Sequence, residues 1–142
     1  KNIGWKTNTK TFIRTLTTAL IESLLEREYG NSYETVENFS RKLKKKAKLL
    51  RKYIKNEQDL EVACICALQT LSAHYQHPSG LLRKSFRALY DMDVLIDDSF
   101  FEWEKSDAFL EWEKYIAENQ SGKDACLTSV KSFLDWLRNI GL

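Results

Sequence analysis

The chain has 142 residues, of which 43% are hydrophobic and 30% are charged, with one Pro, five Gly and a net charge of +2. This composition excludes a disordered chain, and the lack of any apolar run of roughly 20 residues excludes a membrane span. Because helix breakers are scarce, we expect one helical domain, residues 1–142, and not a β-sandwich with its many turns.

Two long helices are predicted in the first 55 residues. The first ends at Gly30-Asn31, and the second begins after Ser32, a residue type favoured at helix N-termini. The apolar stripe of the first helix is Phe12, Ile13, Leu16, Ala19, Leu20 and Leu24. The stripe of the second is Val36, Phe39, Leu43, Ala47, Leu50 and Ile54. We also expect a short extra helix around Ile3 to Lys6.

Further helices follow along the chain. Asn56 is the expected cap of the third helix, whose inner face is Leu60, Ala63, Cys64, Ala67, Leu68 and Leu71. A loop at residues 77–80 precedes a fourth helix from Leu81 to about Tyr90. The fifth helix is expected to begin at a cap chosen from Asp97, Asp98 and Ser99. The last helix is expected to run from about Lys123 to Ile140, with Leu127, Val130, Phe133, Leu134 and Leu137 inward.

About six to seven helices with short loops, and no strand-like alternation, predict an all-α fold. The arrangement expected for such a pattern is an antiparallel array of helical pairs, an α-α superhelix. Three cysteines, an odd number set in helical patterns, favour a reducing compartment, so we expect a cytoplasmic protein.

The two halves of the chain differ in charge. Residues 1–55 carry fourteen Lys and Arg against five Asp and Glu, whereas residues 56–142 carry eight against fifteen. The strongest local signal is residues 91–118, which hold ten acidic residues interleaved with six aromatic ones. Large apolar anchors with a rim of one charge sign suit an interface for a basic partner segment. The alternative is that the aromatic residues are core and the acidic residues form a solvated helix face.

The basic residues concentrate on the second helix. Nonspecific binding of RNA phosphates is one interpretation, and a solvated helix face or an acidic protein partner are the others. The residues of this possible RNA surface are Lys42, Lys44, Lys45, Lys46, Lys48, Arg51 and Lys52.

Neither a metal site nor a catalytic site is predicted. Cys64 and Cys66 lie two apart on a helix and point to different faces, so they do not suit one zinc ion. We expect Cys64 in the core and His74 at a helix end. The chain has no Gly-rich phosphate loop, nucleophile elbow or His-Glu-x-x-His motif, so we expect no enzyme, no cofactor and no small-molecule substrate.

Several blocks of sequence, in order, resemble a known family. They are residues 47–54 (AKLLRKYI), 56–61, 67–69, 78–82, 88–94 (ALYDMDV), 98–104 (DSFFEWE), 122–123 and 129–137 (SVKSFLDWL). Together they resemble the C-terminal HEAT domain of the initiation factor 4G scaffold proteins. This W2-type domain is shared more distantly with initiation factor 5 and the epsilon subunit of the 2B exchange factor. The resemblance implies a HEAT-like fold and a domain from the C-terminal part of a larger scaffold.

The family has two acidic and aromatic boxes, which match residues 97–104, centred on Trp103, and residues 133–137, centred on Trp136. In the 4G scaffolds the domain docks kinases of the cap-binding protein. In its factor 5 and 2B-epsilon relatives it binds lysine-rich segments of the initiator-tRNA carrier. We therefore expect a protein-docking domain, with RNA binding or factor 5-like binding as alternatives. The expected partner-binding residues are Asp97, Asp98, Glu102, Trp103, Glu104, Glu111, Glu113 and Trp136.

Two features depart from the family pattern. The second box of the family continues into an acidic tail, whereas this chain ends Arg138-Asn139-Ile140-Gly141-Leu142. The segment 105–120 is also longer than expected and contains a second Phe-Leu-Glu-Trp-Glu-Lys run. Both departures bear on the acidic surface, and the first removes acidic residues next to it.

Overall fold

The computed structural model describes residues 9–28, 35–75, 80–105 and 127–140, and these contain six helices and no strand. The helices are α1 (Lys10–Glu28), α2 (Thr35–Ile54), α3 (Gln58–His74), α4 (Leu81–Asp91), α5 (Asp97–Lys105) and α8 (Lys131–Ile140). The predicted all-α, HEAT-like class is confirmed. None of the helices in these ranges combines the length and apolar character needed to cross a membrane.

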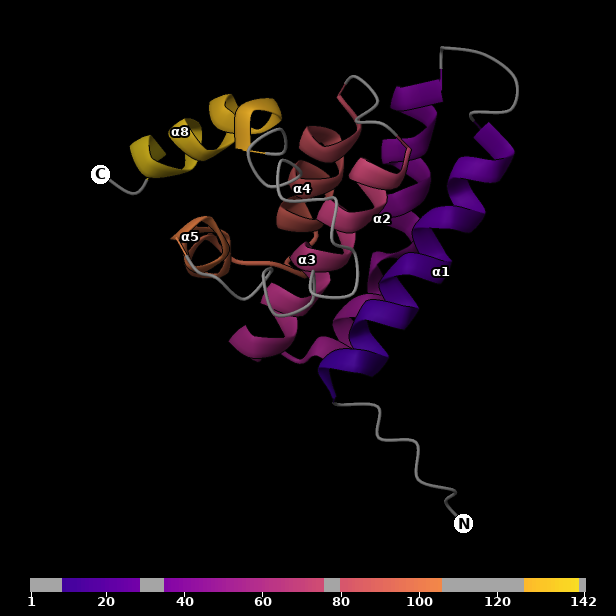
Figure 1. The fold of residues 1–142 in the computed structure, drawn as a ribbon, viewed down its shortest axis with the longest axis horizontal. Helices are drawn as coiled ribbons and strands as arrows, with labels where there is room; N and C mark the ends of the chain where they lie inside the picture. Colours follow the sequence, from indigo (N-terminus) through magenta and orange to yellow (C-terminus); the bar gives the residue numbers. More distant parts are fainter. Residues whose placement is uncertain (1–8, 29–34, 76–79, 106–126, 141–142) are drawn as a thin grey trace.

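The helices stack in two layers (Figure 1). In one layer α3 lies between α1 and α5, and in the other α4 contacts α2. Rings from α4 and α8 also meet, with the Phe86 and Phe133 centroids 5.9 Å apart, so α8 continues the second layer. The pairs α1/α2, α3/α4 and α5/α8 each place one helix in each layer, as expected for a HEAT-like array.

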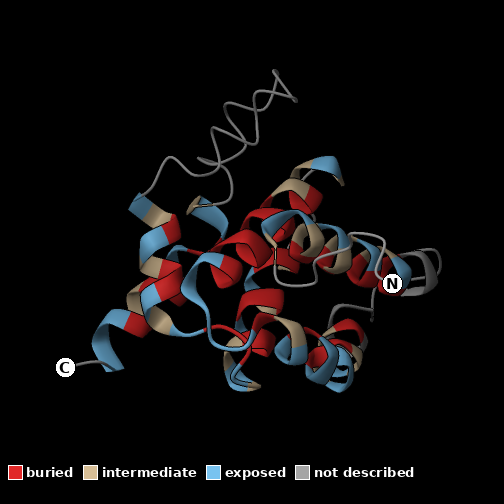
Figure 2. Cartoon of the chain, turned by 90° about the horizontal axis from the view of Figure 1, so that it is seen from below, coloured by how far each residue is buried: buried red, intermediate tan, exposed pale blue. Residues whose placement is uncertain are grey.

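The core lies between the layers, where the buried residues gather (Figure 2). The stripe of α2 is confirmed, because five of its predicted members have at most 1% of their surface exposed: Phe39, Leu43, Ala47, Leu50 and Ile54. In α1 the stripe is partly wrong, since Ala19 is exposed whereas Ile21 and Leu25 are buried.

Helix α3 is more deeply buried than its pattern indicated. Its predicted inner residues are buried, but so are six others: Glu61, Val62, Ile65, Cys66, Gln69 and Ser72. The reason is its central position, because α1, α4 and α5 all pack against it. Two of these extra residues, Glu61 and Gln69, are polar and contact α5, as described below.

Helix boundaries differ from expectation at three places. The N-cap of α3 is Glu57, not Asn56, because Lys55 and Asn56 adopt left-handed φ values of 55° and 62° in the turn after α2. Helix α4 begins after Gly80, whose φ of 78° suits glycine, and extends one residue beyond Tyr90. The last helix is not continuous, since residues 127–129 are helical, Val130 is a turn and α8 starts at Lys131. The short helix expected at Ile3 to Lys6 lies outside the described residues.

Candidate functional site

Helix α5 is fixed at its N-terminus by a buried carboxylate from α3. Oε1 of Glu61 accepts hydrogen bonds from the backbone N–H of Ile96, at 2.9 Å, and from the hydroxyl of Ser99, at 2.8 Å. Glu61 has no exposed surface, so these bonds are shielded from water. A carboxylate at a helix N-terminus also interacts favourably with the helix dipole. This contact therefore orients α5 relative to the core.

A second polar contact fixes α5 further along. The indole N–H of Trp103 donates to Oε1 of Gln69 over 2.7 Å, and both side chains are fully buried. Glu61 comes before Gln69 on α3, and their partners on α5, Ser99 and Trp103, come in the same order. The two helices therefore run in the same direction. Trp103, an expected partner-binding residue, thus lies in the core and presents no surface to a partner.

An aromatic cluster connects α5 to α4 and α8. Its members are Phe86, Tyr90, Phe100, Trp103, Phe133 and Trp136. Trp103 contacts Phe86 edge-on at 5.4 Å, and Trp136 contacts Tyr90 at 5.7 Å. The two tryptophans expected in one docking surface therefore lie at different places in this cluster, one buried and one half-buried.

The acidic residues expected on α5 divide into two groups. Asp98 and Glu102 are exposed, lie one helical turn apart, and make no ion pair with any residue in the described ranges. Asp97 is half-buried, and its Oδ1 accepts the backbone N–H of Asp98 at 2.9 Å. Asp97, Asp98 and Ser99 all lie within α5, so the expectation that one of them caps this helix is wrong, and Ile96 is the residue that precedes it. Glu111 and Glu113 lie outside the described residues.

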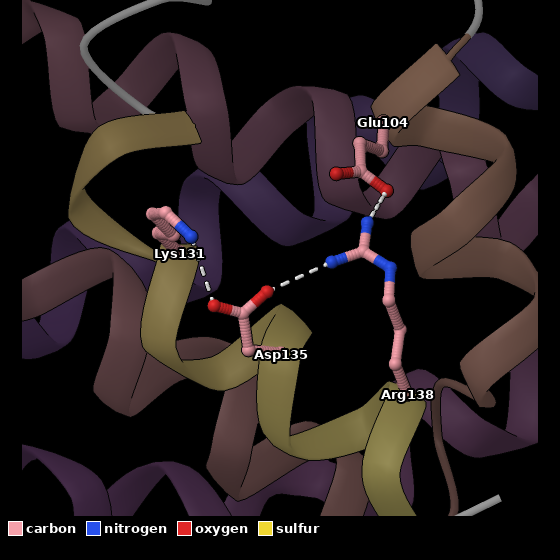
Figure 3. A network of polar contacts seen from close by, with 4 residues as sticks. All are labelled: Glu104, Lys131, Asp135 and Arg138. Carbon is pink, nitrogen blue, oxygen red and sulfur yellow. Dashed lines mark hydrogen bonds and ion pairs between the residues drawn. The ribbon is translucent and has the colours of Figure 1, made fainter.

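Glu104 belongs to a charge network with α8 (Figure 3). Its carboxylate is paired with the guanidinium of Arg138, which also contacts Asp135 at 3.0 Å. The Asp135 carboxylate is held in turn by Nζ of Lys131 at 2.9 Å. The hydrogen bond from Lys131, followed by the charges of Lys131 and Arg138, lowers the pKa of Asp135 below its ordinary value. The hydrogen bond to Glu104 raises the pKa of Arg138.

The Arg138 network lines a cavity of about 270 Å³ between α5 and α8. Of the described residues, two acidic and two basic side chains border it, so their charges largely cancel. Arg138 directly follows the second box, residues 133–137, and it neutralises an acidic residue of the first box. Among the described acidic residues of α5, Asp98 and Glu102 are therefore the exposed ones that have no ion pair.

The basic residues of α2 also divide into two groups. Lys44 pairs with Asp91 at 3.3 Å, Arg51 donates to the carbonyl of Met92 at 3.2 Å, and Lys52 lies 5.4 Å from the Tyr53 ring centre. These contacts attach α2 to the end of α4 or to its own surface. By contrast, three lysines are exposed and make no ion pair within the ranges that the structure covers: Lys45, Lys46 and Lys48. Lys42 is half-buried.

The described cysteine and histidine residues, Cys64, Cys66 and His74, do not gather into a site. Cys64 and Cys66 are both buried free thiols, and burial raises the pKa of Cys64 to about 12. A thiol with so high a pKa is a poor nucleophile and a poor metal ligand at neutral pH. His74 is exposed as the last residue of α3, at a helix end as expected. In the described ranges no group of three His, Cys, Asp or Glu residues could hold a metal ion.

Three contacts were not found by sequence reasoning: Glu61 with Ile96 and Ser99, Gln69 with Trp103, and Arg138 with Glu104. The first two involve polar residues within an otherwise apolar helix, which is a usable signal for a buried polar role. For Arg138, the signal was a basic residue directly after the second acidic and aromatic box.

Comparison with known proteins agrees with this arrangement. A family model described as W2, eIF4-gamma/eIF5/eIF2-epsilon, matches residues 60–140. The chain is similar to eukaryotic translation initiation factor 4 gamma 1 of Mus musculus, with 45% identity over 96 residues, which is 68% of this chain and 5% of that protein. It is similar to eukaryotic translation initiation factor 4 gamma 3 of Homo sapiens, with 33% identity over 128 residues, 90% of this chain and 7% of that protein. It thus spans less than a tenth of the length of either relative.

Proposed function

Since the chain belongs to the W2 family of eIF4-gamma, eIF5 and eIF2-epsilon, whose members include translation initiation factors, we propose that it docks a protein partner through the exposed acidic face of α5. The partner would present a basic segment, and the candidates are a kinase of the cap-binding protein or another initiation factor. We further propose that residues 1–142 form one W2-type domain of a longer scaffold, and that its role is not catalytic.

The observation that carries this proposal is the pair Asp98 and Glu102. Both are exposed, they lie one turn apart, and neither forms an ion pair with a described residue. Two like charges at this spacing repel each other, so a cation placed between them relieves the repulsion. The Glu61 and Gln69 contacts hold α5 in place, which lowers the conformational entropy that α5 loses when a partner binds.

A charge-reversal experiment tests the acidic face. We would measure binding of a fluorescein-labelled octalysine peptide by anisotropy, and compare Glu102→Lys with Glu22→Lys. Glu22 lies on α1, at the other end of the layer from α5, and its reversal changes the net charge equally (Figure 1). Glu102→Lys should weaken binding about fivefold and Glu22→Lys much less. Equal effects of the two variants would refute a docking face on α5.

The identity of the partner needs a second step. Wild-type domain and Glu102→Lys would be used as bait in lysate, and captured proteins identified by mass spectrometry. Selective loss of a kinase with Glu102→Lys supports 4G-like docking, and selective loss of the initiator-tRNA carrier supports the factor 5-like alternative.

RNA binding is a second candidate function, favoured by the exposed residues Lys45, Lys46 and Lys48 of α2. Phosphate contacts of this kind give affinity that falls steeply with salt. The triple reversal of these lysines to glutamate should remove retention of an RNA oligomer across a salt series. Unchanged retention would exclude α2 as the RNA surface.

A further inference from the structure

A shallow groove of about 150 Å³ lies between α4 and α8, on the opposite side of α8 from the Arg138 network. We name it the α4–α8 groove, and its lining residues are Arg83, Arg87, Ser132, Phe133 and Trp136. The Arg138 network is bordered instead by Lys131, Leu134, Asp135 and Arg138 of the same helix. Helix α8 therefore separates a site of mixed charge from a groove whose only charged lining side chains, among the described residues, are two arginines.

Arg87 is held in a defined orientation at this groove. Its guanidinium carbon lies 4.2 Å from the centre of the Trp136 ring, and its Nε donates to Oδ1 of Asp91 at 3.0 Å. The Tyr90 and Trp136 rings lie nearly perpendicular with their centroids 5.7 Å apart, which fixes the indole in turn. The terminal nitrogens of Arg87 make no hydrogen bond with the described residues. A guanidinium fixed in this way presents a planar pair of donors that suits an oxyanion.

Arg83 adds a second positive charge one helical turn before Arg87. It is exposed and makes no ion pair in the part of the chain that the structure describes. Asp91, which pairs with Arg87, is already shared with Lys44 at 3.3 Å. The two arginines lie one turn apart on the α4 side of the groove and repel each other, and an anion between them relieves that repulsion. The hydroxyl of Ser132 supplies a neutral donor to the same space.

We propose that the α4–α8 groove binds a carboxylate side chain from an acidic segment of a partner protein. A protein segment fits better than RNA because Arg87 covers one face of Trp136, and base stacking needs an open aromatic face. The volume of the groove also suits one side chain better than a row of bases. The site is independent of the proposed acidic face, since it lies on other helices and selects the opposite charge.

The test uses a fluorescein-labelled octaglutamate peptide, followed by anisotropy at low ionic strength. The matched variants are Arg83→Glu and Lys45→Glu, because each reverses one exposed cation without a described ion pair. Arg83→Glu should weaken binding about tenfold, and Lys45→Glu less than about twofold. Ser132→Glu, which places a carboxylate in the groove, should abolish binding. Arg87 is not replaced, because it also holds Asp91 and Trp136.

Several results would overturn the proposal. Equal weakening by Arg83→Glu and Lys45→Glu would mean that the peptide responds only to overall charge. Tighter binding of octauridylate than of octaglutamate, with the same dependence on Arg83, would make the groove an RNA site. An absence of peptide binding would remove the site altogether. Glu102→Lys should leave octaglutamate binding undiminished. A failure of the groove proposal can therefore be distinguished from a failure of the proposed acidic face on α5.

Discussion

The indole N–H of Trp103 donates to the side-chain oxygen of Gln69 over 2.7 Å, with both residues fully buried. Trp103 is the centre of the first acidic and aromatic box, yet it faces α3 and the aromatic cluster and not solvent. Its position sets the rotation of α5 about its axis, and that rotation exposes Glu102 while directing Glu104 toward α8. The tryptophan thus affects the proposed docking surface through the placement of its acidic neighbours.

Trp103→Phe should destabilise the domain. The substitution removes the hydrogen bond to the Gln69 side-chain oxygen and leaves space beside Phe86. We expect the free energy of unfolding to fall by about 2–3 kcal/mol, because a buried polar group loses a partner and packing is lost as well. Urea denaturation followed by circular dichroism measures this change.

The double variant Gln69→Leu/Trp103→Phe separates the hydrogen bond from the packing. If the bond couples the two residues, the free energy of unfolding of the double variant should fall by about 1 kcal/mol less than the sum of the decreases in Gln69→Leu and Trp103→Phe. Losses that simply add would mean that the bond contributes nothing beyond the separate side chains.

Glu61→Ala should loosen the start of α5. Its Oε1 accepts from both the Ile96 N–H and the Ser99 hydroxyl, so both donors lose their acceptor. We expect the free energy of unfolding to fall by about 2–4 kcal/mol in Glu61→Ala. The decrease should be smaller in Glu61→Gln, whose amide oxygen can accept the same two hydrogen bonds. Hydrogen exchange gives the more specific readout, since the Ile96 amide should lose protection in Glu61→Ala. Retained protection at Ile96 would contradict the role of Glu61 as a cap.

Much of the fold could be predicted because it depends on periodic apolar residues. The stripe Phe39 to Ile54 on α2 alone determines which side of that helix is buried. Periodicity fails for α3, where burial on several sides leaves no polar face to reveal the orientation. It fails again at Val130, because nothing in the apolar pattern of residues 123–140 marks a turn there.

The candidate site was less predictable because charge pairing depends on tertiary contacts. The sequence places Glu102 and Glu104 two residues apart with the same charge, yet only Glu104 meets Arg138. That difference comes from the rotation of α5 and from the closeness of α8, neither of which is local. Likewise, Trp103 and Trp136 share a motif type, and only their positions in the aromatic cluster distinguish them.

Asp135 should titrate below its ordinary range, and Lys131 should be the main cause. Its hydrogen bond with Lys131 is the largest influence on the pKa, ahead of the contact with Arg138. Lys131→Ala should therefore raise the pKa of Asp135 more than Arg138→Gln does. Because the folded pKa is lowered, the associated stabilisation is present at neutral pH and is lost as pH falls below about 4. Carbon-13 NMR of the carboxyl group gives the pKa directly, and a larger shift in Arg138→Gln would contradict this order.

Alkaline pH should destabilise the domain through Cys64. Burial raises the pKa of this thiol from 9.0 to about 12, so above pH 9 it ionises in the unfolded chain but not in the folded one. The stabilisation is complete below pH 9 and is lost as pH rises toward 12, by up to about 1.4 kcal/mol per pH unit. Stability measured from pH 8 to 10.5 should therefore fall more steeply for the wild type than for Cys64→Val. If stability falls equally with pH in the wild type and in Cys64→Val, ionisation of Cys64 does not cause the loss of stability between pH 8 and 10.5.

Removing the charge of Arg138 should strengthen the binding of a basic peptide. Arg138 pairs with Glu104 and contacts Asp135, so Arg138→Gln releases the carboxylate of Glu104, on the same helix as Asp98 and Glu102, while Asp135 keeps its contact with Lys131. The matched control is Asn139→Glu, which lowers the net charge by the same amount at the next residue of α8. If the pairing with Glu104 limits the acidic face, Arg138→Gln should tighten octalysine binding severalfold, and Asn139→Glu should do so less. The difference should shrink with added salt, because exposed charges are screened. Equal gains from the two variants would mean that overall charge, and not the release of Glu104, governs the affinity.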